Sequence, residues 1–92
     1  MNTAFLLMAQ YNALAVIPVE AVVRDYFPHL TVQSFLRKVA LAEIRIPLVR
    51  MDPQSQKGAK GVHLNDLVQY IDARRAAAAK ELEQMTNRLH RD

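Results

Sequence analysis

Cysteine is absent from this sequence of 92 residues, and glycine occurs only twice. The lack of cysteine excludes disulfide bonds, thiolate metal ligands and thiol nucleophiles, and it suits a reducing compartment such as the cytosol. Two isolated glycines cannot form a glycine-rich phosphate-binding loop. The sequence has neither a His-Glu-x-x-His motif nor a nucleophile elbow, and its three histidines lack metal-ligand spacing. We therefore expect no enzyme activity, no metal, no cofactor and no small-molecule substrate.

Charge is absent from the first nineteen residues, which raises the question of a signal peptide or a membrane span. Asn2 and Thr3 stand where a signal peptide would carry Lys or Arg. Gln10, Tyr11 and Asn12 interrupt the apolar run well before the roughly 20 residues that a span requires. We therefore interpret this segment as part of a folded core and expect no membrane association.

Positive charge is concentrated in the middle third of the chain. Residues 31–63 hold six basic and two acidic side chains, a net charge of +4, whereas the whole chain has a net charge of +3. About half of the residues are apolar (51%), which is enough for one small folded domain. A basic segment of this kind is typical of a nucleic-acid contact, although an ordinary solvated surface has the same composition.

The N-terminal segment predicts a short helix followed by extended chain. Residues 3–12 fit a helix capped by Thr3, but a strand over residues 5–8 fits the short apolar pattern as well. Val16 and Ile17 are expected to be extended because the residue before a proline is disfavoured in the helical region.

A pair of closely spaced helices is predicted next. Pro18 suits the first position of a helix over residues 18–27, and Pro28 ends that helix. Thr31 is a good N-cap for a second helix over residues 31–44. Two helices joined by so short a turn are typical of a helix-turn-helix.

The helix predicted over residues 31–44 has one apolar face and one polar face that lacks acids. Its apolar positions are Val32, Phe35, Leu36, Val39 and Ala40, continued by Ile44. The other face carries Gln33, Ser34, Arg37, Lys38 and Leu41. Gln, Ser and Arg can hydrogen-bond to base edges and Lys can contact phosphates, but an ordinary solvated helix face would look similar.

The segment after this helix favours DNA binding. Residues 46–51 predict a strand, residues 52–61 a loop and residues 62–64 a return strand, so that the three form a basic β-hairpin. Lysines in the loop can reach a phosphate or a minor groove, whereas a solvated surface loop is the alternative. The predicted base contacts are Gln33, Ser34 and Arg37, and the predicted phosphate contacts are Thr31, Lys38, Arg50, Lys57 and Lys60.

A final helix is predicted over residues 66–89, capped by Asn65 or Asp66. At 1.5 Å per residue it would be ~36 Å long, which is more than a small core requires. Beyond the alanine run, apolar residues recur at steps of four, three and four: Ala78, Leu82, Met85 and Leu89. This spacing is typical of a coiled-coil seam, although Arg75 interrupts it and a frayed tail is the alternative. We therefore divide the chain into a DNA-binding domain, residues 1–75, and a dimerising extension, residues 76–92.

Several blocks of the sequence resemble the pyocin activator protein family (PrtN type). They are MNTAFLLMAQYNALAVIP, RDYFPHLT, FLRKV, IPLVR and GVHLNDLVQYIDARRAAA, and their order and spacing match the family from Met1 to about Lys80. Residues 17–74 also resemble the excisionase type of winged helix-turn-helix, through the I-P-x-V-R strand and the D-L-x-x-Y-I helix. Ala42 stands where the excisionase pattern usually has a glycine.

This resemblance implies a small cytoplasmic regulator that activates genes for phage-tail-like bacteriocins by binding DNA upstream of them. The expected fold class is α+β, mainly α: a winged helix-turn-helix with a β-hairpin wing and a long C-terminal helix. The expected partners are double-stranded DNA and a second copy of the chain, with RNA polymerase as a further candidate. An excisionase-like architectural factor and a protein-binding adaptor or anti-repressor are the alternatives.

Overall fold

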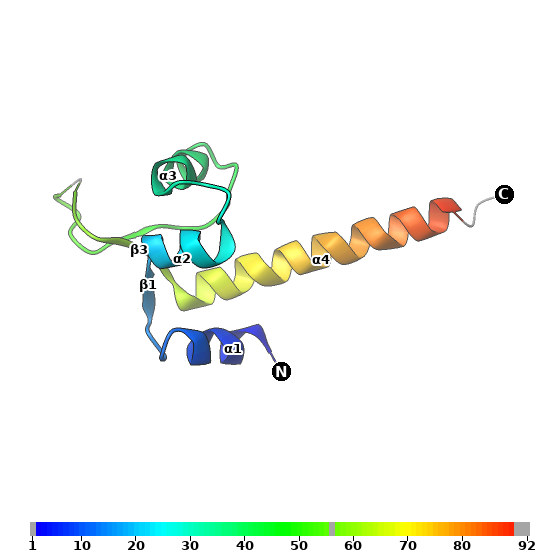
Figure 1. The fold of residues 1–92 in the computed structure, drawn as a ribbon, viewed down its shortest axis with the longest axis horizontal. Coiled ribbons are helices and arrows are strands. Elements are labelled where there is room, and N and C mark those ends of the chain that lie inside the picture. Colours follow the sequence, from blue (N-terminus) through cyan, green and yellow to red (C-terminus); the bar gives the residue numbers. More distant parts are fainter. Residues whose placement is uncertain (1, 56, 90–92) are drawn as a thin grey trace.

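The computed structural model describes residues 2–55 and 57–89 of the chain. These residues contain four helices and a three-stranded antiparallel sheet (Figure 1). The elements are α1 (Thr3–Gln10), β1 (Val16–Pro18), α2 (Val19–Tyr26), α3 (Val32–Ala40), β2 (Val49–Arg50), β3 (Lys60–His63) and α4 (Leu64–Leu89). A small, mainly helical α+β class is therefore confirmed. No helix among these residues is long and apolar enough to cross a membrane. The last three residues of the predicted 76–92 extension lie outside the described residues.

The first half of α4 packs on the rest of the fold, and its second half extends away from it (Figure 1). Helix α4 begins at Leu64, two residues earlier than predicted. The backbone N–H of Asn65 donates to Nδ1 of His63 at 3.1 Å, so the His63 side chain satisfies one of the free donors at the start of the helix. The prediction of Asn65 or Asp66 as the cap was therefore wrong.

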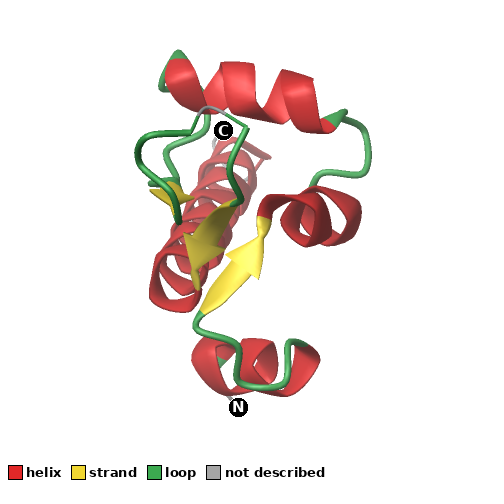
Figure 2. Cartoon of the chain, turned by 90° about the vertical axis from the view of Figure 1, so that its left-hand side faces the viewer, coloured by secondary structure: helices red, strands yellow, loops and turns green. Residues whose placement is uncertain are grey.

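Helix α1 lies against α4 on the side of the molecule opposite to α3 (Figures 1 and 2). The predicted helix in this segment is confirmed, and the alternative of a strand over residues 5–8 is wrong. Asn2, and not Thr3 as predicted, caps α1 by accepting a hydrogen bond from the backbone N–H of Phe5 at 2.8 Å. The Thr3 hydroxyl instead donates to Asp72 of α4 at 2.6 Å. Leu7 is buried, whereas the outer face of the helix exposes Phe5, Leu6 and Met8. The exposed face of α1 is therefore apolar and uncharged.

Hydrogen bonds from the end of α1 tie it to α2. The Tyr11 hydroxyl donates to Asp25 at 2.7 Å, and the Tyr26 hydroxyl donates to Gln10 at 2.8 Å. Hydrogen bonds from Arg24 and Tyr11 hold the pKa of Asp25 below its ordinary value. Burial and the hydrogen bond to Asp25 raise the pKa of Tyr11. Asp25 is thus an ionised acceptor that joins the two helices at neutral pH.

An aromatic cluster joins α2, α3 and α4. Phe27 lies just after α2. The centroid of its ring is 5.0 Å from the ring centroid of Phe35 in α3 and 5.9 Å from that of Tyr70 in α4. The cluster sets how α3 sits on the rest of the fold.

Helix α2 starts at Val19, because Pro18 has an extended backbone and belongs to β1. The prediction that Pro18 lies in the first turn of this helix was therefore wrong.

Helix α3 ends at Ala40, four residues before the predicted end. Ala42 has a φ of 60°, in the left-handed region that disfavours residues with a Cβ atom. The backbone N–H of Glu43 donates to the carbonyl of Lys38 at 2.9 Å and closes the helix end. Ile44 is buried as predicted, but it reaches the core from the segment after the helix and not from the helix face.

The central strand of the sheet is β3, which pairs with β1 on one side and with β2 on the other. The predicted hairpin exists, but β2 covers Val49–Arg50 and not residues 46–51. Pro47 has no N–H for a ladder and has a fixed φ, which accounts for the shorter strand. Strand β3 covers Lys60–His63, so the predicted return strand over residues 62–64 was shifted toward the C-terminus.

Gly61 is required where the three strands meet. It is the register partner of both Pro18 in β1 and Val49 in β2. A Cβ atom at this position would lie 2.6 Å from Cγ1 of Val16 and 2.7 Å from the carbonyl oxygen of Ile17. The backbones of β1 and β3 can therefore approach this closely only because residue 61 has no side chain.

Replacing Gly61 with Ala should lower the free energy of unfolding by ~1–3 kcal/mol, because backbone atoms would have to move away from the new methyl group. Thermal and urea unfolding followed by circular dichroism measure this loss. Gly58→Ala is the matched control, since its new Cβ would approach no atom closer than 3.2 Å. An equal loss in both variants would contradict the assignment of Gly61.

Replacing Ala42 with Gly should raise the free energy of unfolding by about 0.5–1 kcal/mol, since relief of left-handed strain exceeds the added freedom of the unfolded chain. Ala73→Gly, at an exposed position inside α4, should lower it by about 1 kcal/mol. Urea unfolding of the two variants and the wild type measures the sign of each change in the free energy of unfolding. Destabilisation by both substitutions would show that residue 42 is not strained.

Candidate nucleic-acid interface

The polar face of α3 points away from the core. Phe35 is fully buried on the opposite face, and this orients Gln33 and Arg37 outward as exposed side chains. Ser34 and Lys38 are half-buried beside them. The structure therefore brings together on one surface all four residues predicted on this face to contact DNA.

The hydroxyl groups at the start of α3 are already hydrogen-bonded. The backbone N–H of Ser34 donates to Oγ1 of Thr31 at 3.1 Å, which is the predicted N-cap. The Thr31 hydroxyl also donates to Oγ of Ser34 at 3.0 Å. A phosphate or a base would therefore have to share these hydroxyls with the helix terminus.

The two basic residues of α3 differ in their surroundings. Nζ of Lys38 lies 3.8 Å from Oε1 of Glu43, a distance at which the acid partly offsets the lysine charge. Arg37 forms no ion pair with any described residue. Arg37 therefore offers the more available cation, with a planar guanidinium group suited to bidentate recognition.

Two cations lie directly opposite each other in the β-hairpin. Arg50 in β2 is the register partner of Lys60 in β3, so Lys60 belongs to a strand and not to the loop in which it was predicted. Like charges at facing positions of an antiparallel pair destabilise the sheet, and an anion bound over both would relieve the repulsion. The facing pair is therefore a candidate contact for an anion.

The connection between β2 and β3 is folded into turns. The backbone N–H of Ser55 donates to the carbonyl of Asp52 at 3.2 Å, and that of Gly58 donates to the carbonyl of Ser55 at 3.4 Å. The side chain of Asp52 accepts from the backbone N–H of Gln54 at 3.2 Å. Lys57 is exposed in this connection. The hairpin thus presents a third cation beyond the Arg50–Lys60 pair.

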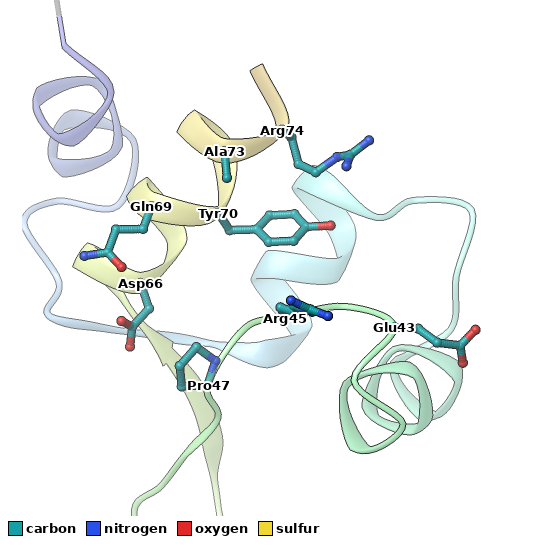
Figure 3. Close-up of a pocket in the computed structure, with 8 residues that line it drawn as sticks. All are labelled: Glu43, Arg45, Pro47, Asp66, Gln69, Tyr70, Ala73 and Arg74. Atoms are coloured by element: carbon teal, nitrogen blue, oxygen red, sulfur yellow. The ribbon is translucent and has the colours of Figure 1, made fainter. Parts of the chain in front are cut away.

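A depression of about 500 Å³ lies between the segment that follows α3 and helix α4 (Figure 3). In Figure 3 the ring of Tyr70 lies between the side chains of Arg45 and Arg74. Glu43 and Asp66 also line it, so two acids balance its two cations. No group of three His, Asp or Glu side chains suited to a metal ion occurs among the described residues.

Arg45 was not among the predicted contacts, although it follows the end of α3 closely and is exposed. The prediction placed the helix end at residue 44, which put Arg45 in the connection to the next strand and gave it no role. The basic charge of residues 31–63 was the one signal in the sequence that included it.

The four residues predicted to dimerise lie apart from this surface, on the second half of α4. The exposed fractions of Leu82, Met85 and Leu89 are 66%, 57% and 80%, and Ala78 is exposed as well. They form an apolar row along the part of the helix that leaves the fold.

Comparison with known proteins identifies the family of this chain. No curated protein and no solved structure matches this chain. The family model described as pyocin activator protein PrtN matches residues 3–78, which is most of the chain. The chain therefore belongs to the pyocin activator protein family.

Proposed function

We propose that this protein activates transcription of pyocin genes by binding DNA upstream of them as a winged helix-turn-helix. Membership of the family supports the role in pyocin gene activation. The observation that carries the DNA-binding part of the proposal is the facing pair Arg50 and Lys60. The polar face of α3, which has no acid, supports it.

In this proposal α2 and α3 form the helix-turn-helix and the β2–β3 hairpin forms the wing. Residues 1–75 would then constitute the DNA-binding domain. Helix α3 enters the major groove, which has room for one α-helix, and the hairpin follows the adjacent backbone or minor groove. The tight connection between Tyr26 and Val32 and the aromatic contact between Phe27 and Phe35 support this division of roles.

The proposed roles of the side chains follow their exposure and their hydrogen-bonding groups. Gln33, Ser34 and Arg37 read base edges, with Arg37 suited to the N7 and O6 atoms of guanine. Thr31, Lys38, Arg50, Lys57 and Lys60 contact phosphates. The phosphate contacts supply most of the affinity and its dependence on salt, whereas the base contacts supply sequence preference.

A transcriptional activator has to contact the transcription machinery as well as DNA, and RNA polymerase is the proposed second partner. The apolar outer face of α1 lies on the side opposite to α3 (Figures 1 and 2). With DNA bound at α3 and the wing, this face stays accessible to a second macromolecule.

Arg37→Ala should reduce discrimination between the target sequence and unrelated DNA by about 1–3 kcal/mol, because one bidentate base contact is lost. Fluorescence anisotropy with DNA from upstream of the pyocin genes and with a scrambled duplex measures both affinities. An unchanged ratio of the two affinities would remove Arg37 from the base-reading set.

Lys57→Ala should weaken binding to both duplexes alike and reduce the slope of log K against log salt by about 1, since one phosphate contact is lost. Lys80→Ala is the control, because it removes one exposed lysine from the half of α4 that leaves the fold. Titrations at 50–200 mM salt separate the two variants. If the protein bound neither duplex but bound another protein with an affinity that does not change with salt, the adaptor alternative would be favoured instead.

A further inference from the structure

The apolar row on α4, formed by Ala78, Leu82, Met85 and Leu89, continues the stripe that packs on the core. Leu64, Val68 and Ile71 occupy the same face of the helix at the same alternating steps and pack against the core. Past Arg75 the helix leaves the fold, and the large side chains of the row become exposed. In heptad notation Leu82 and Leu89 occupy a positions, while Ala78 and Met85 occupy d positions.

We propose that a second copy of this chain covers the row, with the two α4 helices antiparallel. In this arrangement Leu82 faces Met85 of the other copy, and Ala78 faces Leu89 of the other copy. A two-fold axis crosses the helix pair between residues 83 and 84 and repeats each contact. The small Ala78 side chain lies opposite the large Leu89, and the two middle layers each pair Leu with Met.

Charge complementarity favours an antiparallel pair of helices over a parallel one. Glu81 and Arg88 both occupy g positions, directly before the two a-position leucines. In an antiparallel coiled coil g positions face g positions, so Glu81 of each copy faces Arg88 of the other. Two opposite-charge pairs thereby flank the apolar layers. The e positions, Ala79 and Thr86, face each other and are uncharged.

A parallel pair would lose these contacts and add a repulsive one. Glu81 would face Thr86 of the other copy, because g positions face e positions in parallel pairs. Arg75 would occupy the a position directly before the Ala78 layer, against Arg75 of the other copy. In the antiparallel pair the overlap runs from Ala78 to Leu89, about 18 Å of helix, and Arg75 lies outside it.

Disulfide trapping distinguishes the two orientations, because the chain has no cysteine of its own. Ala78→Cys and Leu89→Cys are prepared separately and oxidised alone and as an equimolar mixture. In the antiparallel pair two residues 78 are offset along the axis by about 16 Å, beyond the reach of a disulfide. We expect a cross-linked dimer in the mixture and not in either variant alone. A cross-linked dimer in either variant alone, or no cross-linked dimer in the mixture, would overturn the proposal.

Charge exchange tests the contacts that set the orientation. Sedimentation equilibrium should show a dimer whose dissociation constant rises about tenfold in Glu81→Arg and in Arg88→Glu, since each creates like-charge contacts. The double variant should return to the wild-type value. A monomer at all concentrations, or single variants equal to the wild type, would overturn the proposal.

Leu82→Ala and Leu41→Ala form a matched pair for the apolar contribution, because these leucines are 66% and 63% exposed on different elements. Only the change at Leu82 should weaken the dimer, while circular dichroism checks that both variants remain folded. All of these measurements are made without DNA. Their outcome is therefore independent of the proposed DNA binding, and either proposal can fail without the other.

Discussion

The packing of Phe35 against Phe27 is the contact on which the candidate DNA-binding surface depends. Helix α3 has nine residues, which is too short for stability on its own, so its position must come from tertiary contacts. The fully buried Phe35 ring provides the largest of these contacts, and Tyr70 completes the cluster from α4. The direction in which Arg37 points is therefore a consequence of one aromatic anchor on the opposite face of the helix.

The faces of the helices could be predicted from the sequence, but their ends could not. The alternation of apolar and polar residues in α3 follows the period of 3.6 residues, which local sequence encodes directly. Its end depends on Ala42, whose left-handed φ is tolerated only because the hydrogen bonds of the following turn and the burial of Ile44 compensate for it. The start of α4 depends on His63, a residue type with weak capping preference.

The most informative part of the candidate site was also beyond the reach of local sequence reasoning. Arg50 and Lys60 were each predicted as phosphate contacts, but their position opposite each other follows from the strand register. That register belongs to the β2–β3 pair, and Gly61 on the same strand β3 allows β1 to approach from the other side. Residues distant in the sequence thus decide that two cations become neighbours, and the pattern of either strand alone does not contain this information.

The length of α4 has a consequence for the DNA sequence that an antiparallel pair could recognise. Leu67, in the core of the fold, would lie ~25 Å along the helix from the two-fold axis, so two such cores would be ~50 Å apart. This separation exceeds the ~34 Å of one turn of B-form DNA. The length of α4 between the core and the axis would therefore set the spacing of the two half-sites. The wing and α3 would not set this spacing.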